Sequence, residues 1–419
     1  MKLLFILPAL GLTIAWSQLS MTVIQAEDRS TITVSSVTVS PEGTPPAPGP
    51  ELLKYTPEEI ERAYEGQPLP EGVRMYLAIV RGGKMNGSEG WFGPAATRYH
   101  WDWLCRTHHI SGDRLGQKQF LGDPSAFQIL DRNNDGYITA DDLDWSDTNE
   151  WVRNSYAINR WFRRMDESGN GEFSRSEWVS LFDRLAGQSD EIRFDQLRDS
   201  IFAGSGAAFQ SGDAPTKETL VQGLLAEEVG SLKEGPPLEG LAPDFELPVL
   251  NGDSTISLQS LVGQKPVVLI FGNFTCGPFR SMYPAVERVV SRHRDDASFL
   301  MIYVREAHPA NGWAMKSNQK AGIEILQPVT LEQRVDVAQQ CSKMLEPTIP
   351  LLVDDVDDRT GHAYSGMPAR LYVIDRKGKV AYKSGRGPFG FKVDEMEQSL
   401  VMLQLDEQIQ ASPPNDAEK

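Results

Sequence analysis

Four short runs of almost uninterrupted apolar residues in the C-terminal half limit most strongly what this chain can fold into. They cover residues 267–271, 299–304, 350–353 and 370–374. Such runs are typical of strands in a sheet that is covered by other elements on both faces. The amphipathic stretches 282–293 and 331–345 between them are long enough to be crossover helices. A tight turn at 375–378 then leads into a last strand.

These elements follow the order β-α-β-α-β-β-α, which is that of the thioredoxin fold. The chain has 419 residues, which predicts two or three domains. Before the sheet region the apolar pattern has the helical period, so we expect a multidomain protein in which an all-α domain precedes an α/β thioredoxin-fold domain. The predicted boundaries are a signal peptide at 1–26, a Pro-rich linker at 27–52, the helical domain at 53–212, a linker at 213–240, the thioredoxin-fold domain at 241–408 and a polar tail at 409–419.

The N-terminus has the shape of a secretory signal. Lys2 precedes the apolar run 3–16, and the small residue Ala26 stands before a charged stretch. The run is shorter than the roughly 20 residues that a spanning helix needs, so we expect an exported, periplasmic or extracellular protein. Membrane anchoring is the alternative if the signal is not cleaved. The formal net charge of −17 argues against a nucleic-acid partner, which would need clustered Lys and Arg.

Two stretches of the helical domain have the spacing of calcium-binding EF-hand loops. Gly136 and Gly171 stand at position six, where the chain must turn sharply so that hard oxygen ligands converge on the ion. Ile138 and Phe173 stand at position eight, which pairs with the same position of a neighbouring loop. The predicted Ca2+ ligands are Asp131, Asn133, Asp135, Tyr137, Thr139 and Asp142 in the first loop, and Asp166, Ser168, Asn170, Glu172, Ser174 and Glu177 in the second.

We expect the two loops to pair with each other and to bind calcium weakly. Asp142 is one methylene shorter than the glutamate usual at position twelve, and the second loop offers only Asp166 and Glu177 as side-chain anions. An acidic, solvated turn is the alternative for either loop. A degenerate loop at 108–119 precedes the pair, but most of its ligand positions are unsuitable.

Cys276 is the main candidate for chemistry. The three cysteines, which include Cys105 and Cys341, cannot all pair within one chain, so at least one thiol is free or intermolecular. Cys276 follows the apolar run 267–271 and precedes a predicted helix, whose N-terminus favours an anion, so we expect its pKa to lie below that of a free cysteine. Residues 365–370 precede a predicted strand in the way that redoxins present a cis-proline beside their reactive sulfur, so we expect Pro368 to form a cis peptide bond here. The alternative is a buried structural cysteine.

Two residues near Cys276 limit the kinds of redox reaction that this cysteine can carry out. Phe279 stands where the dithiol motif of thioredoxins has its second sulfur, which excludes a local disulfide cycle. Peroxiredoxins prefer threonine three residues before their cysteine, whereas that position holds Asn273, so the peroxidase motif is not matched.

Two longer segments carry a family resemblance. Residues 268–279 read VLIFGNFTCGPF and residues 302–313 read IYVREAHPANGW. With RLYVI at 370–374 and GRGPFG at 385–390, these segments resemble the iodothyronine deiodinases over residues 266–404, with cysteine in place of selenocysteine. The resemblance implies that Cys276 attacks a soft electrophilic atom, in that family an aryl-bound iodine, while Glu306 and His308 supply and relay a proton. The substrate-binding residues that it implies are Thr275, Pro368, Arg370 and Arg386.

Alternatives remain for several of these residues. His308 could be a polar loop residue capped by Trp313, and the two arginines could form surface ion pairs. Phe274 stands where many family members have a second cysteine, and the family's substrate-contacting histidine falls on Pro328. Cys341 is either a resolving thiol or a buried helix residue, so we expect an external thiol reductant or a thioredoxin-like donor.

The sequence therefore predicts a deiodinase-like thiol oxidoreductase with calcium-binding EF-hands, acting on an iodinated phenol in the manner of a thyroxine 5'-deiodinase. One alternative is a thiol peroxidase that reduces hydroperoxides with the same sulfur. Another is a calcium-responsive binding protein whose redoxin domain has no catalytic role.

Overall fold

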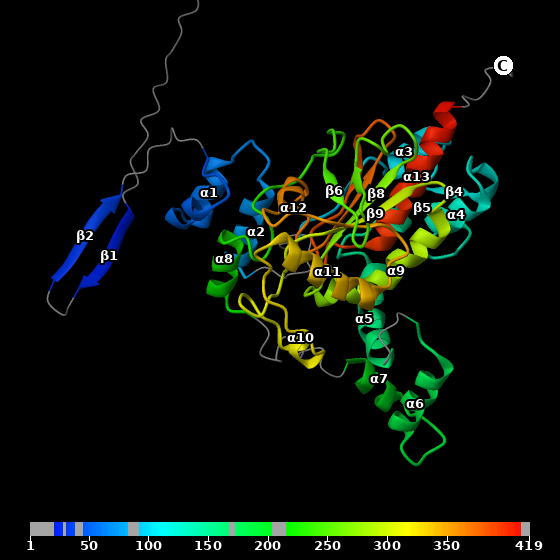
Figure 1. Ribbon diagram of the computed structural model, residues 1–419, viewed down its shortest axis with the longest axis horizontal. Coiled ribbons are helices and arrows are strands. Elements are labelled where there is room, and N and C mark those ends of the chain that lie inside the picture. The colour runs from blue at the N-terminus through cyan, green and yellow to red at the C-terminus, as the bar shows by residue number, and fades with distance from the viewer. Residues whose placement is uncertain are drawn as a thin grey trace, which may run out of the picture.

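A computed structural model describes residues 21–27, 31–37, 45–82, 92–166, 172–202 and 215–411 (Figure 1). Its centre is a six-stranded sheet with the strand order β10-β9-β8-β11-β12-β3. The strands are β8 (Val267–Gly272), β9 (Ser298–Tyr303), β10 (Leu351–Val353), β11 (Arg370–Ile374), β12 (Val380–Lys383) and β3 (Ala96–Thr97). β8, β9 and β10 are parallel, and β11 is antiparallel to both β8 and β12. The predicted α/β redoxin domain is confirmed.

The helices of this domain come from the amphipathic stretches. α9 (Gly277–His293) follows β8, α11 (Leu331–Leu345) precedes β10, and α13 (Val393–Ala411) follows β12. α9 contacts both α11 and α13, and α13 also contacts β11 and β12. Shorter elements complete the domain: α10 (Lys316–Lys320), α12 (Arg359–Tyr364), and a hairpin of β6 (Glu246–Pro248) and β7 (Thr255–Ser257).

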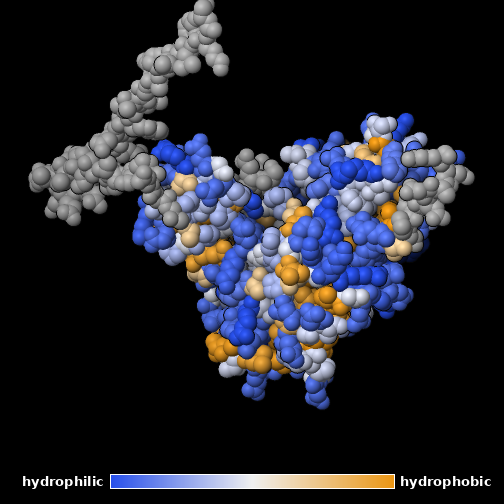
Figure 2. All heavy atoms as spheres, turned by 90° about the horizontal axis from the view of Figure 1, so that it is seen from above, coloured by the Kyte–Doolittle hydropathy of each residue, from blue (hydrophilic) through white to orange (hydrophobic). Residues whose placement is uncertain are grey.

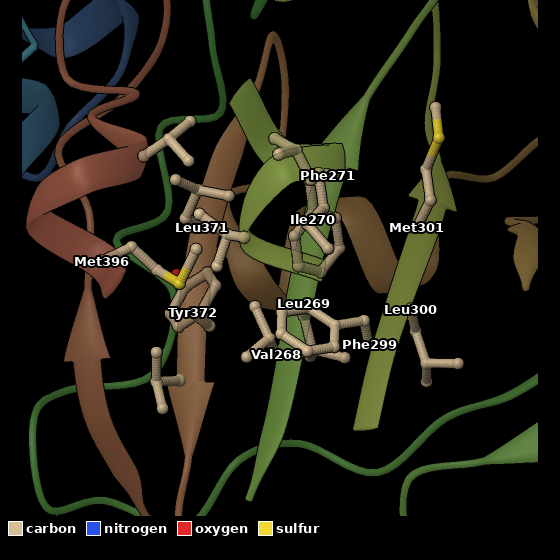
Figure 3. Packing of buried hydrophobic residues seen from close by; sticks show 14 of the residues in the cluster. Val268, Leu269, Ile270, Phe271, Phe299, Leu300, Met301, Leu371, Tyr372 and Met396 are labelled. Carbon is tan, nitrogen blue, oxygen red and sulfur yellow. The ribbon is translucent and has the colours of Figure 1, made fainter. Parts of the chain in front are cut away.

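The core lies between the sheet and these helices. Every residue of β8 and β11 is buried, because both strands are central in the sheet and covered on both faces. Figure 3 shows Met396 of α13 beside Leu371 and Tyr372 of β11. Burial of one large apolar side chain is worth roughly 1.5–3 kcal/mol. The core therefore fixes the end of β8, where the turn to Cys276 begins.

The N-terminal region is not a separate all-α domain, which corrects the prediction. β3 pairs with β12, with Thr97 opposite Tyr382, so this region supplies the sixth strand of the redoxin sheet. α3 (Trp101–Thr107) and α4 (Pro124–Leu130) follow it. Their buried residues Leu104 and Leu130 belong to the same core as the sheet. A two-residue edge strand leaves no periodic pattern, so the sequence could not reveal it.

The EF-hand pairing also differs from the prediction. β5 (Tyr137–Thr139), in the first calcium loop, pairs with β4 (Arg114–Gly116) of the degenerate loop 108–119, and Ile138 lies opposite Leu115. Leu115 is the eighth residue of the degenerate loop, and both side chains are fully buried. The ligand positions of the degenerate loop are mostly unsuitable for calcium, so the sequence did not suggest it as a partner. Pairing of two loops depends instead on an apolar residue at position eight, which Leu115 supplies.

Two helical groups complete the described chain. α5 (Glu150–Met165), α6 (Arg175–Ala186) and α7 (Phe194–Phe202) contact one another and project from the body in Figure 1. α1 (Pro57–Ala63) and α2 (Glu71–Val80) form a smaller core with α8 (Lys217–Leu225). α8 falls inside the predicted linker 213–240, so part of that linker is a packed helix.

The N-terminal predictions lie largely outside the described residues. β1 (Met21–Glu27) and β2 (Thr31–Val37) pair as an antiparallel hairpin, whereas most of the predicted signal 1–26 is not described. Within the described ranges, no helix combines the length and the apolar character needed to cross a membrane. Figure 2 shows hydrophilic residues over most of one face, with apolar residues gathered in patches.

Candidate active site

Cys276 lies where the central strand gives way to a helix. It is the N-cap residue of α9 and follows β8 after a three-residue turn, 273–275. Its backbone carbonyl accepts a hydrogen bond from the N–H of Arg280 at 3.2 Å, which closes the first turn of the helix. The predicted position at a strand end and a helix N-terminus is confirmed.

Asn273 organises this turn, although the sequence analysis assigned it no role. Its Oδ1 accepts hydrogen bonds from the N–H of Cys276 at 3.0 Å, the hydroxyl of Thr275 at 3.2 Å and the N–H of Ala307 at 3.2 Å. Its Nδ2 donates to the carbonyl of Pro368 at 2.9 Å. The side chain is completely buried. The only signal in the sequence was its place three residues before the cysteine.

Pro368 follows a cis peptide bond from Met367, as predicted. The hydrogen bond from Asn273 brings it to the turn that carries Cys276. Met367 is buried and lines a cleft described below. The structure therefore places the cis-proline at the cysteine turn.

Thr275 connects the two predicted proton-transfer residues. Its N–H donates to Oε2 of Glu306 at 2.8 Å, and its hydroxyl oxygen accepts from the N–H of His308 at 2.9 Å. The side chain of Thr275 is buried, which suits a residue that holds the site together better than one that binds substrate. Its predicted contact with substrate stays a prediction.

Glu306 is buried at the end of β9. Burial raises the pKa of its carboxyl, against the hydrogen bonds from Tyr303 and Thr275, which lower it. The Tyr303 hydroxyl donates to Oε1 of Glu306, and the same oxygen of Tyr303 accepts from the N–H of Phe274 at 3.1 Å. Tyr303 is therefore a second residue of this site that the sequence analysis missed.

His308 is partly buried beside Trp313. Its Nδ1 lies 3.1 Å from the backbone oxygen of Trp313, and the two rings meet edge to face with their centroids 4.8 Å apart. If Nδ1 is the donor in this contact, Nε2 is the unprotonated nitrogen of the neutral ring. The predicted capping contact with Trp313 is present, and it does not exclude a catalytic role.

The Cys276 thiol is more buried than predicted. Only 1% of the residue is exposed. Burial raises its pKa to about 11, although the N–H of Phe279 and the charge of Arg280 act in the opposite direction. The helix N-terminus is present, as expected, but desolvation outweighs it. The expected lowering of the pKa is therefore wrong for this closed arrangement.

Arg370 and Arg386 do not face the cysteine turn as predicted. Arg386 Nε donates to Oε1 of Glu71 at 2.9 Å, and Arg370 Nη2 lies 3.2 Å from the same oxygen. Both arginines are buried. Burial alone would raise the pKa of Glu71, but the two guanidinium groups lower it to about 2. The structure corrects both proposed roles: these residues anchor α2 to the redoxin domain, in buried rather than surface ion pairs.

The other two cysteines form no disulfide in the structure. Cys341 lies buried on α11, and Cys105 is partly exposed. Burial raises the pKa of Cys341, whereas the charge of Arg280 lowers it. Arg280 thus acts on the sulfurs of both Cys276 and Cys341.

A cleft of about 420 Å³ opens beside this turn. Its lining includes Glu306, Ala307 and Met367, so it reaches the buried cluster around the cysteine. The walls also hold Trp313 and Pro328, the position predicted to replace a family histidine. A planar apolar group could therefore rest between these walls, with a polar end toward the charged residues of the cleft.

The first calcium loop has an ordered network of carboxylates. Asp131 accepts from the N–H groups of Asp135 at 3.1 Å and Gly136 at 2.9 Å, and Asp142 accepts from the N–H of Thr139 at 2.8 Å. Burial raises the pKa of Asp131, and the negative charges of Asp135 and Asp142 add to the effect, whereas the hydrogen bonds from Gly136 and Asp135 lower it. However, within the described ranges no cluster of three or more His, Cys, Asp or Glu side chains is arranged as a metal site.

The second loop is described only in part. Ser168 and Asn170 lie outside the described residues. Glu177 accepts a hydrogen bond from the N–H of Ser174 at 2.8 Å, which forms a capping box at the start of α6. Glu177 therefore stabilises the N-terminus of α6, which is a structural role that its place in the sequence also allows.

Comparison with known proteins agrees with this geometry. Residues 228–404 match the iodothyronine deiodinase family, and residues 125–144 match the EF-hand family. The chain is 35% identical over 176 residues to thyroxine 5-deiodinase from Homo sapiens, which covers 42% of this chain and 56% of that protein. It is 35% identical over 156 residues to thyroxine 5-deiodinase from Gallus gallus, with 37% and 58% covered. The chain thus spans little more than half the length of these relatives.

Two solved structures are also similar. One is a putative protein disulfide isomerase from Bacteroides thetaiotaomicron, with 24% identity, a TM-score of 0.29, and coverage of 42% of this chain and 91% of that chain. The other is a putative thiol:disulfide interchange protein DsbE from Chlorobium tepidum, with 19% identity, a TM-score of 0.29, and coverage of 41% and 99%.

Proposed function

From the premise that residues 228–404 form an iodothyronine deiodinase family domain, we propose that this chain is a thiol-dependent oxidoreductase that removes iodine from an iodinated phenol. The observation that carries the proposal is the hydrogen-bonded turn 273–275. Through Asn273 and Thr275 it joins the backbone of Cys276 to Glu306, His308 and cis-Pro368.

In the proposed reaction, the Cys276 thiolate attacks the iodine of the substrate. A sulfur–iodine bond forms while the aryl carbon–iodine bond breaks, and the carbon takes a proton relayed through His308 and Glu306. An external thiol then attacks Cys276, which releases iodide and forms a mixed disulfide. A second thiol restores Cys276 and leaves the reductant as a disulfide, so two thiols are oxidised for each iodide released.

The cleft supports an aryl substrate. Trp313 and Pro328 supply apolar walls, and Arg305 and Arg334 supply positive charge on the same cleft. Both arginines already contact Asp358, at 3.6 Å and 3.2 Å, so their charge is partly neutralised. We therefore infer that the ring of the substrate contributes more to binding than its charged end does.

A buried thiol must become accessible before it can react. Since burial holds the pKa of Cys276 at about 11, turnover requires an opened form in which the sulfur meets the cleft. Slow turnover at neutral pH is the expected consequence.

The test is iodide release from a small iodophenol in the presence of dithiothreitol. We expect release by the parent chain, its loss in Cys276→Ser, and its retention in Cys105→Ser, which alters a cysteine outside the site. Equal release from the parent and Cys276→Ser would refute the proposal. A parallel measurement of hydroperoxide consumption tests the peroxidase alternative, in which oxygen replaces iodine as the electrophile.

A second candidate function has an observation in its favour. The burial of Cys276 and its raised pKa suit a redoxin domain without catalysis, in a calcium-responsive binding protein. Neither iodide release nor peroxide consumption, in a folded chain that binds calcium, would favour this candidate.

We also propose that loop 131–142 binds calcium, because its sequence has the ligand spacing of an EF-hand loop and residues 125–144 match that family. Burial is the largest effect that raises the pKa of Asp131, and the nearby charges of Asp135 and Asp142 raise it further. The side chains of Asn133 and Thr139 and the backbone carbonyl of Tyr137 would complete the oxygen ligands. Calcium bound there would neutralise the carboxylates and rigidify the loop.

The family match does not bear on cellular location. We keep export as a proposal that rests on the signal-like residues 1–26. N-terminal sequencing of the secreted or periplasmic protein would test it, because cleavage near Ala26 is expected.

A further inference from the structure

The segment that follows His308 returns over the cysteine turn. The N–H of Ala310 donates to the carbonyl of Ile325 at 2.7 Å, so the ends of this segment are close together, as in an Ω-loop. α10 lies within the loop, and most of its residues are exposed. Asn318 is the exception, with 3% of its surface exposed.

Asn318 bridges the two sides of Cys276. Its Nδ2 donates to the carbonyl of Thr275 at 2.7 Å, and its Oδ1 accepts from Nη2 of Arg280 at 3.0 Å. Thr275 directly precedes the cysteine, and Arg280 lies one helical turn after it. The two bonds use both polar atoms of one amide, so a side chain without that amide cannot replace them.

The bridge also fixes a charge beside the sulfur. Arg280 is held from its other side by a hydrogen bond from Nη1 to the carbonyl of Phe274. Its positive charge lowers the pKa of Cys276, against the larger effect of burial. Asn318 therefore ties the loop to the residue before the cysteine and holds in place the charge that favours its thiolate.

We propose that Asn318 is a positioning residue that latches the Ω-loop 310–325 over the Cys276 turn and orients Arg280 toward the sulfur. The inference deepens the proposed function, on which it rests, by naming the contact that must open before the thiol can meet substrate. When the loop lifts, the bond to Thr275 breaks and the thiol gains access to the cleft.

The test is alkylation of Cys276 by iodoacetamide in the full-length chain, measured between pH 7 and 11 by mass spectrometry of the Cys276 peptide. The variants are Asn318→Ala and Asn318→Asp, and Gln319→Ala is the matched control, because it removes an exposed amide from the same helix. Each lost hydrogen bond shifts an opening equilibrium by roughly fivefold. We therefore expect alkylation of Asn318→Ala at pH 8 to be roughly 10- to 30-fold faster than in the control. The apparent pKa should fall, because opening relieves the burial that raises the pKa of Cys276 by more than the charge of Arg280 lowers it.

Asn318→Asp keeps the volume of the side chain but turns the donor toward Thr275 into an acceptor, so we expect it to accelerate alkylation as well. Circular dichroism shows whether each variant folds. If Asn318→Ala does not fold, Asn318→Asp takes its place in the test. Arg280→Gln should shift the apparent pKa of Cys276 upward, because the charge is lost. An alkylation rate and pH profile unchanged from the control in the folded Asn318 variants would overturn the proposal.

In alkylation the sulfur attacks the carbon of iodoacetamide and displaces iodide, so it does not require the attack on aryl-bound iodine, and the two proposals fail separately. Accelerated alkylation without iodide release from the iodophenol in any variant would overturn the proposed function and keep the latch. Iodide release from the iodophenol with unchanged alkylation would overturn the latch and keep the proposed function.

Discussion

The Nδ2 of Asn273 donates a hydrogen bond to the carbonyl oxygen of Pro368 at 2.9 Å, across 95 residues of sequence. This bond joins the turn after β8 to the loop before β11, the two neighbouring strands at the centre of the sheet. The geometry of the cysteine turn therefore depends on a residue that itself carries out no chemistry.

Asn273→Ala should destabilise the chain by about 2–4 kcal/mol, since it leaves several buried hydrogen-bonding groups without partners. The free energy of unfolding in urea measures this loss. Gln319→Ala removes an exposed amide and should change it by less than about 0.5 kcal/mol. Equal stability of the two variants would contradict the role of Asn273.

The parent Cys276 should be nearly inert to iodoacetamide at neutral pH. With a pKa of about 11, roughly one thiol in a thousand is ionised at pH 8, so the alkylation rate should rise about tenfold per pH unit up to that pKa. In the urea-unfolded chain the same cysteine should titrate near 8.5. If the alkylation rate of the folded chain stopped rising below pH 9, the thiol would not be held in the buried form.

Glu71→Gln should cost about 3–5 kcal/mol, because it leaves the buried charges of Arg370 and Arg386 without their counter-ion. Thermal unfolding of the variant measures the loss, and Glu65→Gln, on an exposed turn, is the control. Unchanged iodide release after correction for the folded fraction would agree with a structural role for both arginines. A large rise in KM alone would instead restore their predicted contact with substrate.

The contribution of Glu395 on α13 to stability should fall as the pH rises toward neutrality. Burial raises its pKa from 4.5 to about 7, although Lys392 and the hydrogen bond from Tyr382 oppose the shift. The folded form binds this proton more tightly than the unfolded chain, so the stabilisation is complete below pH 4.5 and is lost as the pH rises through 7. It amounts to at most about 3 kcal/mol, and less because the side chain is only partly buried.

Glu395→Gln should remove this part of the pH dependence. Urea unfolding of both chains between pH 4 and 8 measures the difference between the two curves. Parallel curves would show that Glu395 does not titrate in this range.

Calcium should raise the melting temperature of the redoxin domain, not only that of the EF-hand loops. Gln398 of α13 donates to the carbonyl of Asp142 at 3.2 Å and accepts from Nε1 of Trp145 at 2.8 Å, which ties the first loop to this helix. At one hundred times the Kd, bound ligand adds about 2.7 kcal/mol, or a shift of roughly 5–11 °C for a domain of this size.

Differential scanning calorimetry with calcium and with chelator measures the shift. Asp131→Asn should abolish most of it, whereas Asp113→Asn, an exposed carboxylate of the degenerate loop, should not. A melting temperature indifferent to calcium in the parent chain would remove the calcium proposal.

Local sequence patterns were sufficient to predict much of the fold of this protein. Continuous apolar runs predicted the central strands, because a strand buried on both faces must be apolar throughout. The position of Cys276 between a strand and a helix was also predictable, because it depends on a few adjacent residues. The cis peptide bond before Pro368 was predicted from its likeness to the cis-proline of redoxins, not from local residues. Segments 268–279 and 302–313, with two shorter ones, carried the resemblance to the iodothyronine deiodinases.

Tertiary structure decided the features that depend on distant groups. A helix N-terminus acts on its own cap residue, but the desolvation that raises the pKa of Cys276 depends on how other segments cover it. Glu71 neutralises Arg386 from 315 residues away, and Leu115, not Phe173, pairs with Ile138. Burial and charge pairing are properties of the assembled core, so no local pattern of residues encodes them.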